Sequence, residues 1–196
     1  MKHFLANVAM LSILVSPAFA ALKQGETAPD FSAKASLAGK EFVFSLKAAL
    51  KRGPVVVYFY PSAYTGGCNI EAHTFAEDKD KFDAAGATII GVSQDSIARL
   101  DDFSSDPSYC ASKFPVASDA DGAITKSYDL SSRAMAGIKD TRGNEIAHAF
   151  TERTTFVIAP DFKIVARLSS ADDKVSPADH AEKSLAVVQQ LAAAKR

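Results

Sequence analysis

The stretch Val55-Val56-Val57-Tyr58-Phe59-Tyr60-Pro61-Ser62-Ala63-Tyr64-Thr65-Gly66-Gly67-Cys68 decides how this chain folds and where one of its two cysteines lies. Its first part, Val55 to Tyr60, has no polar alternation, which is typical of a strand covered on both faces. An amphipathic stretch starts near Gly67, so we expect a strand, a tight loop and then a helix. The free N–H groups and the dipole of a helix start stabilise a thiolate. The sequence therefore predicts that Cys68 is a reactive thiolate.

Strands and helices alternate along the rest of the chain. Apolar runs predict strands over 87–92, 114–117, 153–159 and 163–168, and two extended pieces around a turn at 36–40. Helical spacing and capping residues predict helices over 46–51, 67–86, 97–103, 124–128 and 176–194. This order predicts the α/β class: one domain over 21–196, with a central mixed sheet flanked by helices and an N-terminal extended or hairpin segment. We expect an irregular loop over 130–149.

The first twenty residues have the pattern of a signal peptide. Lys2 is followed by an apolar run from Phe4 to Val15, and the segment ends in Ala18-Phe19-Ala20. The run is shorter than the ~20 residues of a membrane span, and small residues at these positions are typical of a cleavage site. We expect cleavage after Ala20 and export to a bacterial periplasm, with no membrane attachment afterwards. The alternative is an uncleaved N-terminal anchor.

Composition excludes some classes of function. The formal net charge is −1 and no basic block is present, so nucleic-acid binding has no electrostatic support. No His, Cys and Asp spacing predicts a metal site, and we expect neither a metal nor an organic cofactor. Cys68 and Cys110 are the two cysteines, and in an oxidising compartment they can also form a purely structural disulfide.

The loop before Cys68 carries residues suited to stabilising a thiolate. Gly66 and Gly67 leave backbone N–H groups open to an anion, and the Thr65 hydroxyl can donate a hydrogen bond to sulfur. Pro61 fixes the direction of the chain at the start of the loop, and we expect Tyr64 to wall the pocket against water.

The cation that such a thiolate needs is less evident from the sequence. Arg153, at the start of an apolar strand, is the candidate, although a solvated strand end is its ordinary interpretation. Glu71 lies one turn after Cys68, where it can orient Arg153 or simply face solvent. His148 and His180 are interpreted as isolated, and His73 as a helix-surface residue.

These residues together resemble a known family. Pro61-x-x-x-Thr65-x-x-Cys68 after a strand is similar to the peroxidatic motif of the peroxiredoxins, the AhpC/TSA superfamily. Further blocks in matching order are Ala28-Pro29-Asp30-Phe31, Ile90-Gly91-Val92-Ser93, Phe114-Pro115 with Ser118-Asp119, and Arg153-Thr154-Thr155-Phe156-Val157-Ile158. The resemblance covers nearly the whole chain after residue 20 and is nearest to the bacterioferritin comigratory protein, or peroxiredoxin Q, branch.

The resemblance implies a thioredoxin-like fold and a thiol-dependent peroxidase with Pro61, Thr65, Cys68 and Arg153 as its catalytic set. Cys68 would reduce hydrogen peroxide or an organic hydroperoxide and become a sulfenic acid. A resolving thiol would then form a disulfide, which a thioredoxin-like or other dithiol reduces. Antioxidant defence is the implied role, and both monomers and homodimers occur in the branch.

The resolving thiol departs from part of that branch. Many relatives carry it five residues after the first cysteine, where this chain has His73. Cys110, in a stretch expected to be flexible, is therefore assigned as the resolving residue of the same chain. Pairing between two subunits and a one-cysteine enzyme remain alternatives.

Two other functions compete with this interpretation. A thioredoxin-like disulfide oxidoreductase acting on exported proteins would usually need Cys-x-x-Cys, which this chain lacks. A non-catalytic exported domain with a structural disulfide would need only the two cysteines.

Overall fold

The apolar run forms the central strand of the fold, β3 (Val55–Phe59), and all of its residues are buried. A computed structural model describes residues 21–194 of the protein, so the expected signal peptide lies outside the described residues. Strand β4 (Thr88–Ser93) pairs with β3 in parallel, and β8 (Thr154–Ile158) pairs with its other side antiparallel. The sheet is therefore mixed at its centre.

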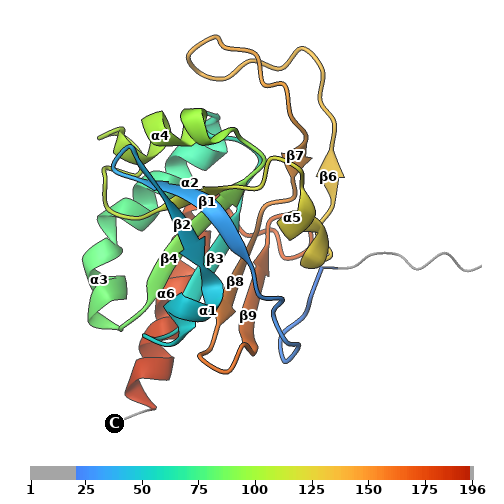
Figure 1. The fold of residues 1–196 in the computed structure, drawn as a ribbon. Helices are drawn as coiled ribbons and strands as arrows, with labels where there is room; N and C mark the ends of the chain where they lie inside the picture. Colours follow the sequence, from blue (N-terminus) through green and yellow to red (C-terminus); the bar gives the residue numbers. More distant parts are fainter. Residues whose placement is uncertain (1–20, 195–196) are drawn as a thin grey trace, which may run out of the picture.

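Seven strands make up this sheet, in the order β2-β1-β5-β4-β3-β8-β9 (Figure 1). The other strands are β1 (Ser32–Leu37), β2 (Lys40–Ser45), β5 (Val116–Ser118) and β9 (Ile164–Ser169). Strands β1 and β2 form an antiparallel hairpin at one edge, and β8 and β9 form another at the opposite edge. The expected α/β fold with an N-terminal hairpin is confirmed.

Helices cover both faces of the sheet. They are α1 (Leu46–Leu50), α2 (Gly66–Glu77), α3 (Lys79–Ala84), α4 (Ile97–Ser105), α5 (Ala123–Ser127) and α6 (Pro177–Ala193). The single helix expected over 67–86 is wrong in one respect, because Asp78 leaves helical geometry (φ −88°, ψ 2°) and divides it into α2 and α3. Ser176 caps α6 by accepting a hydrogen bond from the Asp179 N–H, as its sequence predicts.

The period-2 geometry of β3 divides the interior into two hydrophobic clusters. Val56 and Tyr58 face the cluster that contains Cys68 and the apolar faces of α2, α4 and α6. Val55, Val57 and Phe59 face the other, with α1 and the N-terminal segment. The ring of Tyr58 stacks on Phe75 of α2 at 4.6 Å between centroids. The Tyr58 ring also requires a glycine at position 91 of the neighbouring strand β4, because a Cβ there would lie 2.6 Å from the Tyr58 hydroxyl oxygen.

The segment expected to be an irregular loop leaves the sheet and returns to it. Strands β6 (Ser132–Arg133) and β7 (Phe150–Thr151) pair at its base. Between them, residues 134–149, here called the strap, form the long excursion at the top of Figure 1. The strap folds back on itself through a hydrogen bond from the Ile146 N–H to the Ile138 carbonyl and another from Asp140 to Asn144. It is therefore an ordered segment without regular secondary structure.

Candidate active site

Cys68 lies in the first turn of α2, directly after the loop that follows β3. Thr65 is the N-cap residue of α2, with extended backbone geometry (φ −110°, ψ 149°). The Cys68 side chain is buried, with 1% of the residue exposed. The strand, loop and helix start thus place the thiol where the sequence predicts, and the thiol is buried there.

Arg153 contacts Cys68 directly. Its Nη2 donates a hydrogen bond to Cys68 Sγ at 3.2 Å, and its Nη1 makes an ion pair with Glu71 Oε2. The register explains this meeting, because Thr154 pairs with Phe59 and the preceding Arg153 therefore emerges beside the loop after β3. One guanidinium thus joins the thiol and the carboxylate that lie one turn apart on α2.

The helix start leaves little space around this guanidinium. A Cβ on Gly67 would lie 3.1 Å from Arg153 Nη2 and 3.2 Å from Pro177 Cγ of α6. Glycine at this position therefore allows the close approach of Arg153, whereas Gly66 faces open space.

The pKa of Cys68 is shifted by several groups around the thiol. Burial raises the pKa of the Cys68 thiol, and the charge of Glu71 acts in the same direction. The charge of Arg153 is the largest influence in the other direction, and it does not reverse the shift. Desolvation is thus the largest influence on this thiol, and in this closed state it opposes the lowered pKa that the sequence predicts.

The loop from Pro61 to Thr65 is held by its own hydrogen bonds. The Thr65 hydroxyl donates its one hydrogen to the Ser62 carbonyl at 2.9 Å, so the expected donation to the Cys68 sulfur is not made in this structure. Tyr64 has left-handed backbone geometry (φ 59°), and its ring packs edge-on against Phe103 and Tyr109. Pro61 is half-buried at the start of the loop. Tyr64 thus extends toward the aromatic side chains near Cys110, and its ring serves as a packing contact there.

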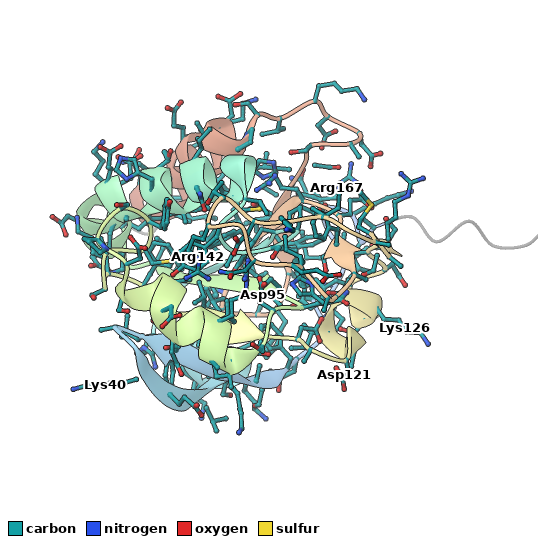
Figure 2. All side chains as sticks on the ribbon, turned by 90° about the horizontal axis from the view of Figure 1, so that it is seen from above. Lys40, Asp95, Asp121, Lys126, Arg142 and Arg167 are labelled. Atoms are coloured by element: carbon teal, nitrogen blue, oxygen red, sulfur yellow. The ribbon has the colours of Figure 1, made fainter. Side chains whose placement is uncertain are left out.

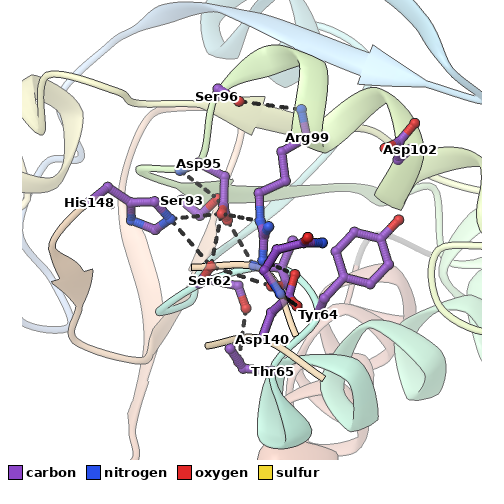
Figure 3. Close-up of polar contacts among 12 residues, drawn as sticks. Ser62, Tyr64, Thr65, Ser93, Asp95, Ser96, Arg99, Asp102, Asp140 and His148 are labelled. Carbon is purple, nitrogen blue, oxygen red and sulfur yellow. Dashed lines mark hydrogen bonds and ion pairs between the residues drawn. The ribbon is translucent and has the colours of Figure 1, made fainter. Parts of the chain in front are cut away.

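Asp95, which follows β4, holds this loop through its carboxylate (Figure 3). Its carboxylate accepts hydrogen bonds from the Ser62 hydroxyl and the Ala63 N–H, both at 2.8 Å. It also accepts from the Ser93 hydroxyl at 2.7 Å and lies 2.7 Å from His148 Nε2. Burial opposes its ionisation, but these bonds, led by that with His148, leave the pKa of Asp95 lowered.

Arg99 of α4 extends this network to the strap. Its Nε lies 2.9 Å from Asp95 Oδ1, and its Nη2 lies 2.8 Å from Asp140 Oδ2. The guanidinium of Arg142 lies 3.3 Å from the centroid of the Tyr64 ring. The view in Figure 2 shows Asp95 and Arg142 toward the middle of the molecule, whereas Lys40 and Lys126 extend from its rim. The strap is therefore joined to the loop before Cys68 by charged groups.

This network could not be foreseen in full from the sequence. The sequence pattern assigns Asp95 only to a helix cap, and the interpretation of His148 as an isolated residue is wrong. An acidic residue at the carboxyl end of a buried parallel strand next to β3 is the available signal. The pairing with His148, fifty-three residues later, has none, because the strap has no periodic pattern.

Comparison with known proteins decides the family. The sequence profile described as the AhpC/TSA family matches residues 24–167. The chain belongs to the AhpC/TSA family. It is a peroxiredoxin, as are the relatives that match it by name.

Individual relatives agree with this assignment. The "Peroxiredoxin Bcp" of Xanthomonas campestris is 34% identical over 135 residues, covering 69% of this chain and 76% of its own. The crystal structure of "Peroxidoxin BcpB" from Mycobacterium tuberculosis has a TM-score of 0.71 and 29% identity, covering 87% of this chain and 98% of its own. A structure of Xanthomonas campestris peroxiredoxin Q has a TM-score of 0.61 and 32% identity, covering 81% and 90%. The thioredoxin-like fold and the resemblance to the Bcp and peroxiredoxin Q branch are confirmed.

Cys110, the other thiol of this peroxiredoxin, is fully buried and not disulfide-bonded. It lies in the turn between α4 and β5, and burial raises the pKa of its thiol well above the ordinary value. The stretch expected to be flexible forms a closed turn in this structure. Backbone hydrogen bonds from Ala111 to Asp106 and from Ser112 to Ser104 close the turn, and the side chain packs in the same cluster as Cys68.

His180 of α6 is also not isolated. Its Nδ1 lies 2.9 Å from the Thr155 hydroxyl and 3.9 Å from Glu71 Oε1, and its Nε2 lies 2.9 Å from the Ser170 hydroxyl. Glu71 is fully buried, so the ordinary interpretation of a solvated helix acid is wrong. His73, by contrast, is exposed, as expected, and lies 3.4 Å from Glu77.

Neither a metal cluster nor a membrane-spanning helix appears in the part of the chain described. Residues 21–194 contain no group of three or more His, Cys, Asp or Glu side chains arranged to hold a metal ion. Within the same residues, no helix combines the length and the apolar character needed to cross a bilayer.

Proposed function

We propose that this peroxiredoxin is exported and defends its compartment against hydrogen peroxide and organic hydroperoxides, with Cys68 as the attacking thiolate. The observation that carries the proposal is the hydrogen bond from Arg153 Nη2 to Cys68 Sγ at the start of α2. The export signal over residues 1–20 supports a periplasmic location. Alkyl peroxide reduction is the activity ascribed to the bacterioferritin comigratory protein of Xanthomonas campestris, whose structure has 32% sequence identity to this chain.

The first step oxidises the sulfur. The Cys68 thiolate attacks the terminal oxygen of the peroxide, so that an S–O bond forms while the O–O bond breaks. The departing oxygen carries the negative charge and takes up a proton, giving water or an alcohol, and Cys68 becomes a sulfenic acid. Arg153 and the free N–H groups at the start of α2 are preorganised donors for the charge that moves from sulfur to oxygen.

The second step uses Cys110 of the same chain. Its thiol condenses with the sulfenic acid, which releases water and forms a disulfide. A thioredoxin-type dithiol then reduces this disulfide by exchange. Both side chains are buried, so the sulfurs can reach a bonding distance of ~2.05 Å only if the loop before Cys68 or the turn of Cys110 opens.

Steady-state turnover tests these assignments. The protein is assayed with thioredoxin, thioredoxin reductase and NADPH, using hydrogen peroxide and cumene hydroperoxide in separate runs. We expect Cys68→Ser to fall to the rate of the blank. Cys110→Ser should consume one equivalent of peroxide and then fail to turn over with thioredoxin. Wild-type turnover by Cys68→Ser would contradict the proposal, and full thioredoxin-supported turnover by Cys110→Ser would contradict the resolving role.

A further inference from the structure

The charge of Arg153 lies between two groups that can each become anionic. Its Nη2 donates to Cys68 Sγ, and its Nη1 pairs with Glu71 Oε2. Glu71 has 0% of its surface exposed, and its second oxygen, Oε1, has no hydrogen-bond partner among the described residues. An ionised carboxylate with an orphaned oxygen in a buried position is unfavourable. The state of Glu71 therefore decides how much of the Arg153 charge is available to Cys68.

His180 is the group that faces this orphaned oxygen, with Nδ1 at 3.9 Å from Oε1. The hydrogen-bond pattern assigns its tautomer. The Ser170 hydroxyl donates its single proton to the Val175 carbonyl at 2.8 Å, so His180 Nε2 must carry the hydrogen that it donates to Ser170. Nδ1 is then the acceptor for the Thr155 hydroxyl. The single lone pair of Nδ1 is thus used by Thr155, and the ring has no N–H on the side near Glu71.

We propose that His180 is a positioning residue that holds Glu71 in its protonated, neutral form, so that the single charge of Arg153 serves the Cys68 thiolate. The inference rests on the proposed role of Cys68. Because Nδ1 accepts from Thr155 and carries no hydrogen, the ring offers no donor to Oε1, and a buried carboxylate oxygen without a donor favours the neutral carboxylic acid. Neutral Glu71 still accepts from Arg153 through Oε2, which keeps the guanidinium in place.

The direction of the pKa shifts agrees with this geometry. Burial raises the pKa of Glu71 to about 7 despite Arg153, so the carboxyl titrates near neutrality. Burial, aided by the charge of Arg153, lowers the pKa of His180 to about 3, so the ring is neutral. Ionised Glu71 raises the pKa of Cys68, so a proton on Glu71 favours the thiolate.

The other groups around this chain of contacts do not replace His180. Asp179 and Lys183 act on His180 from α6 but are half-exposed and lie 3.7 Å from each other. Tyr58 of β3 interacts electrostatically with both Glu71 and Cys68, but burial raises its pKa well above the ordinary value, so it stays neutral. Among the described residues, Arg153, Cys68 and His180 are thus the groups whose charge or polarity bears directly on Glu71.

The experiment measures the thiolate without using peroxide. The rate at which iodoacetamide alkylates Cys68 is followed against pH in a Cys110→Ser background. His180→Asn replaces the lone pair at Nδ1 by an amide that can donate to Glu71, so Glu71 ionises more easily. We expect alkylation to slow about tenfold below about pH 7, which corresponds to a rise of about one unit in the pKa of Cys68, with the high-pH rate unchanged.

Glu71→Gln supplies the decisive background, because glutamine is a permanently neutral side chain of the same shape. Here His180→Asn should change the profile by less than about twofold. His73→Asn, an exposed histidine on the same helix as Cys68, is the control and should match wild type. A His180→Asn profile within twofold of wild type would overturn the proposal. Equal slowing with and without Glu71→Gln would show a structural role that does not pass through Glu71.

A second variant keeps the test valid if His180→Asn does not fold. His180→Gln likewise replaces the ring by a side-chain amide that can donate to Glu71. The same slowing is expected, and a wild-type profile would overturn the proposal. If alkylation responds as described but no peroxide is consumed, the proposed function fails and the role of His180 stands.

Discussion

The role of Gly67 in the reaction of Cys68 can be tested separately from its role in folding. A Cβ at this position would lie within 3.1–3.2 Å of Arg153 Nη2 and Pro177 Cγ, so alanine must displace one of them. Alanine is also the better helix former, by at most about 1 kcal/mol. We expect Gly67→Ala to slow the reaction of Cys68 with hydrogen peroxide by about ten- to a hundredfold, since a lost charge-assisted hydrogen bond is worth ~1.5–3 kcal/mol.

Stopped-flow measurement of peroxide consumption, together with a thermal melt, checks this prediction. Gly66→Ala is the matched control, because its Cβ would meet nothing within 4 Å. Equal rates for the two variants would show that the close approach of Arg153 to the helix start has no role in the reaction.

Arg153 gives a second prediction for a single side chain. Lysine keeps the charge but has one nitrogen, which cannot reproduce the fork that joins Cys68 to Glu71. We expect Arg153→Lys to lower the peroxide rate constant by at least about tenfold, because the donor aimed at sulfur and the one aimed at Glu71 can no longer act together. A rate constant equal to that of wild type would show that the charge alone is sufficient.

The strap is an element whose attachment depends on pH. Its His148 lies 2.7 Å from Asp95, whose carboxylate also holds Ser62 and Ala63. Burial opposes the charge on His148, but the bond to Asp95 leaves its pKa raised. A raised histidine pKa contributes stability that is fully present below the unfolded value of ~6.5 and is lost as pH rises through the folded value.

The prediction compares Tm of wild type and His148→Gln. Below about pH 6, wild type should be more stable by about 1 kcal/mol, allowing for the partial exposure of the imidazole, or by ~2–4 °C. The difference should shrink as pH rises above the raised pKa of His148. A Tm difference that is constant from mildly acidic to mildly alkaline pH would show that the charge of His148 does not hold the strap.

The parts of the fold that can be predicted from the sequence are those with local signals. Val55 to Tyr60 lacks polar residues, Ser176 precedes Pro177, and Gly86 follows an amphipathic run, so strands and helices are placed to within a few residues. The break at Asp78 gives no such signal, because α3 continues the same periodicity. The strap cannot be placed, because its contacts with Asp95, Arg99 and Tyr64 are long-range and leave no period in the sequence.

The residues of the site, like the elements of the fold, can be predicted where the sequence carries a local signal. Cys68, Thr65 and Arg153 follow from the motif and the resemblance, and the structure brings the thiol and the guanidinium together. The burial of Cys110 cannot be predicted, because a cysteine after Ser- and Asp-rich sequence gives no sign of the hydrophobic cluster that encloses it. Desolvation, which sets the direction of both pKa shifts, is a property of the packed molecule.

The molecule as a whole encloses both cysteines in one hydrophobic cluster, and this limits how they can pair. An internal disulfide requires the loop before Cys68 or the turn of Cys110 to open, and it leaves the oxidised protein as a single chain. We expect oxidised wild type to run as a monomer on a non-reducing gel, and to be cut faster by protease near residues 62–68 and 106–114 than the reduced protein. A covalent dimer on that gel would assign resolution to a second subunit.

The reaction of the reduced protein with one equivalent of hydrogen peroxide, followed by peptide mass spectrometry with a sulfenic acid trap, tests the role of Cys68 most directly. In Cys110→Ser we expect one trapped sulfenic acid, on Cys68. In wild type we expect a disulfide between Cys68 and Cys110, and in Cys68→Ser no rapid loss of peroxide. Rapid peroxide consumption by Cys68→Ser, or oxidation of Cys110 before Cys68, would contradict the assignment of Cys68 as the attacking thiolate.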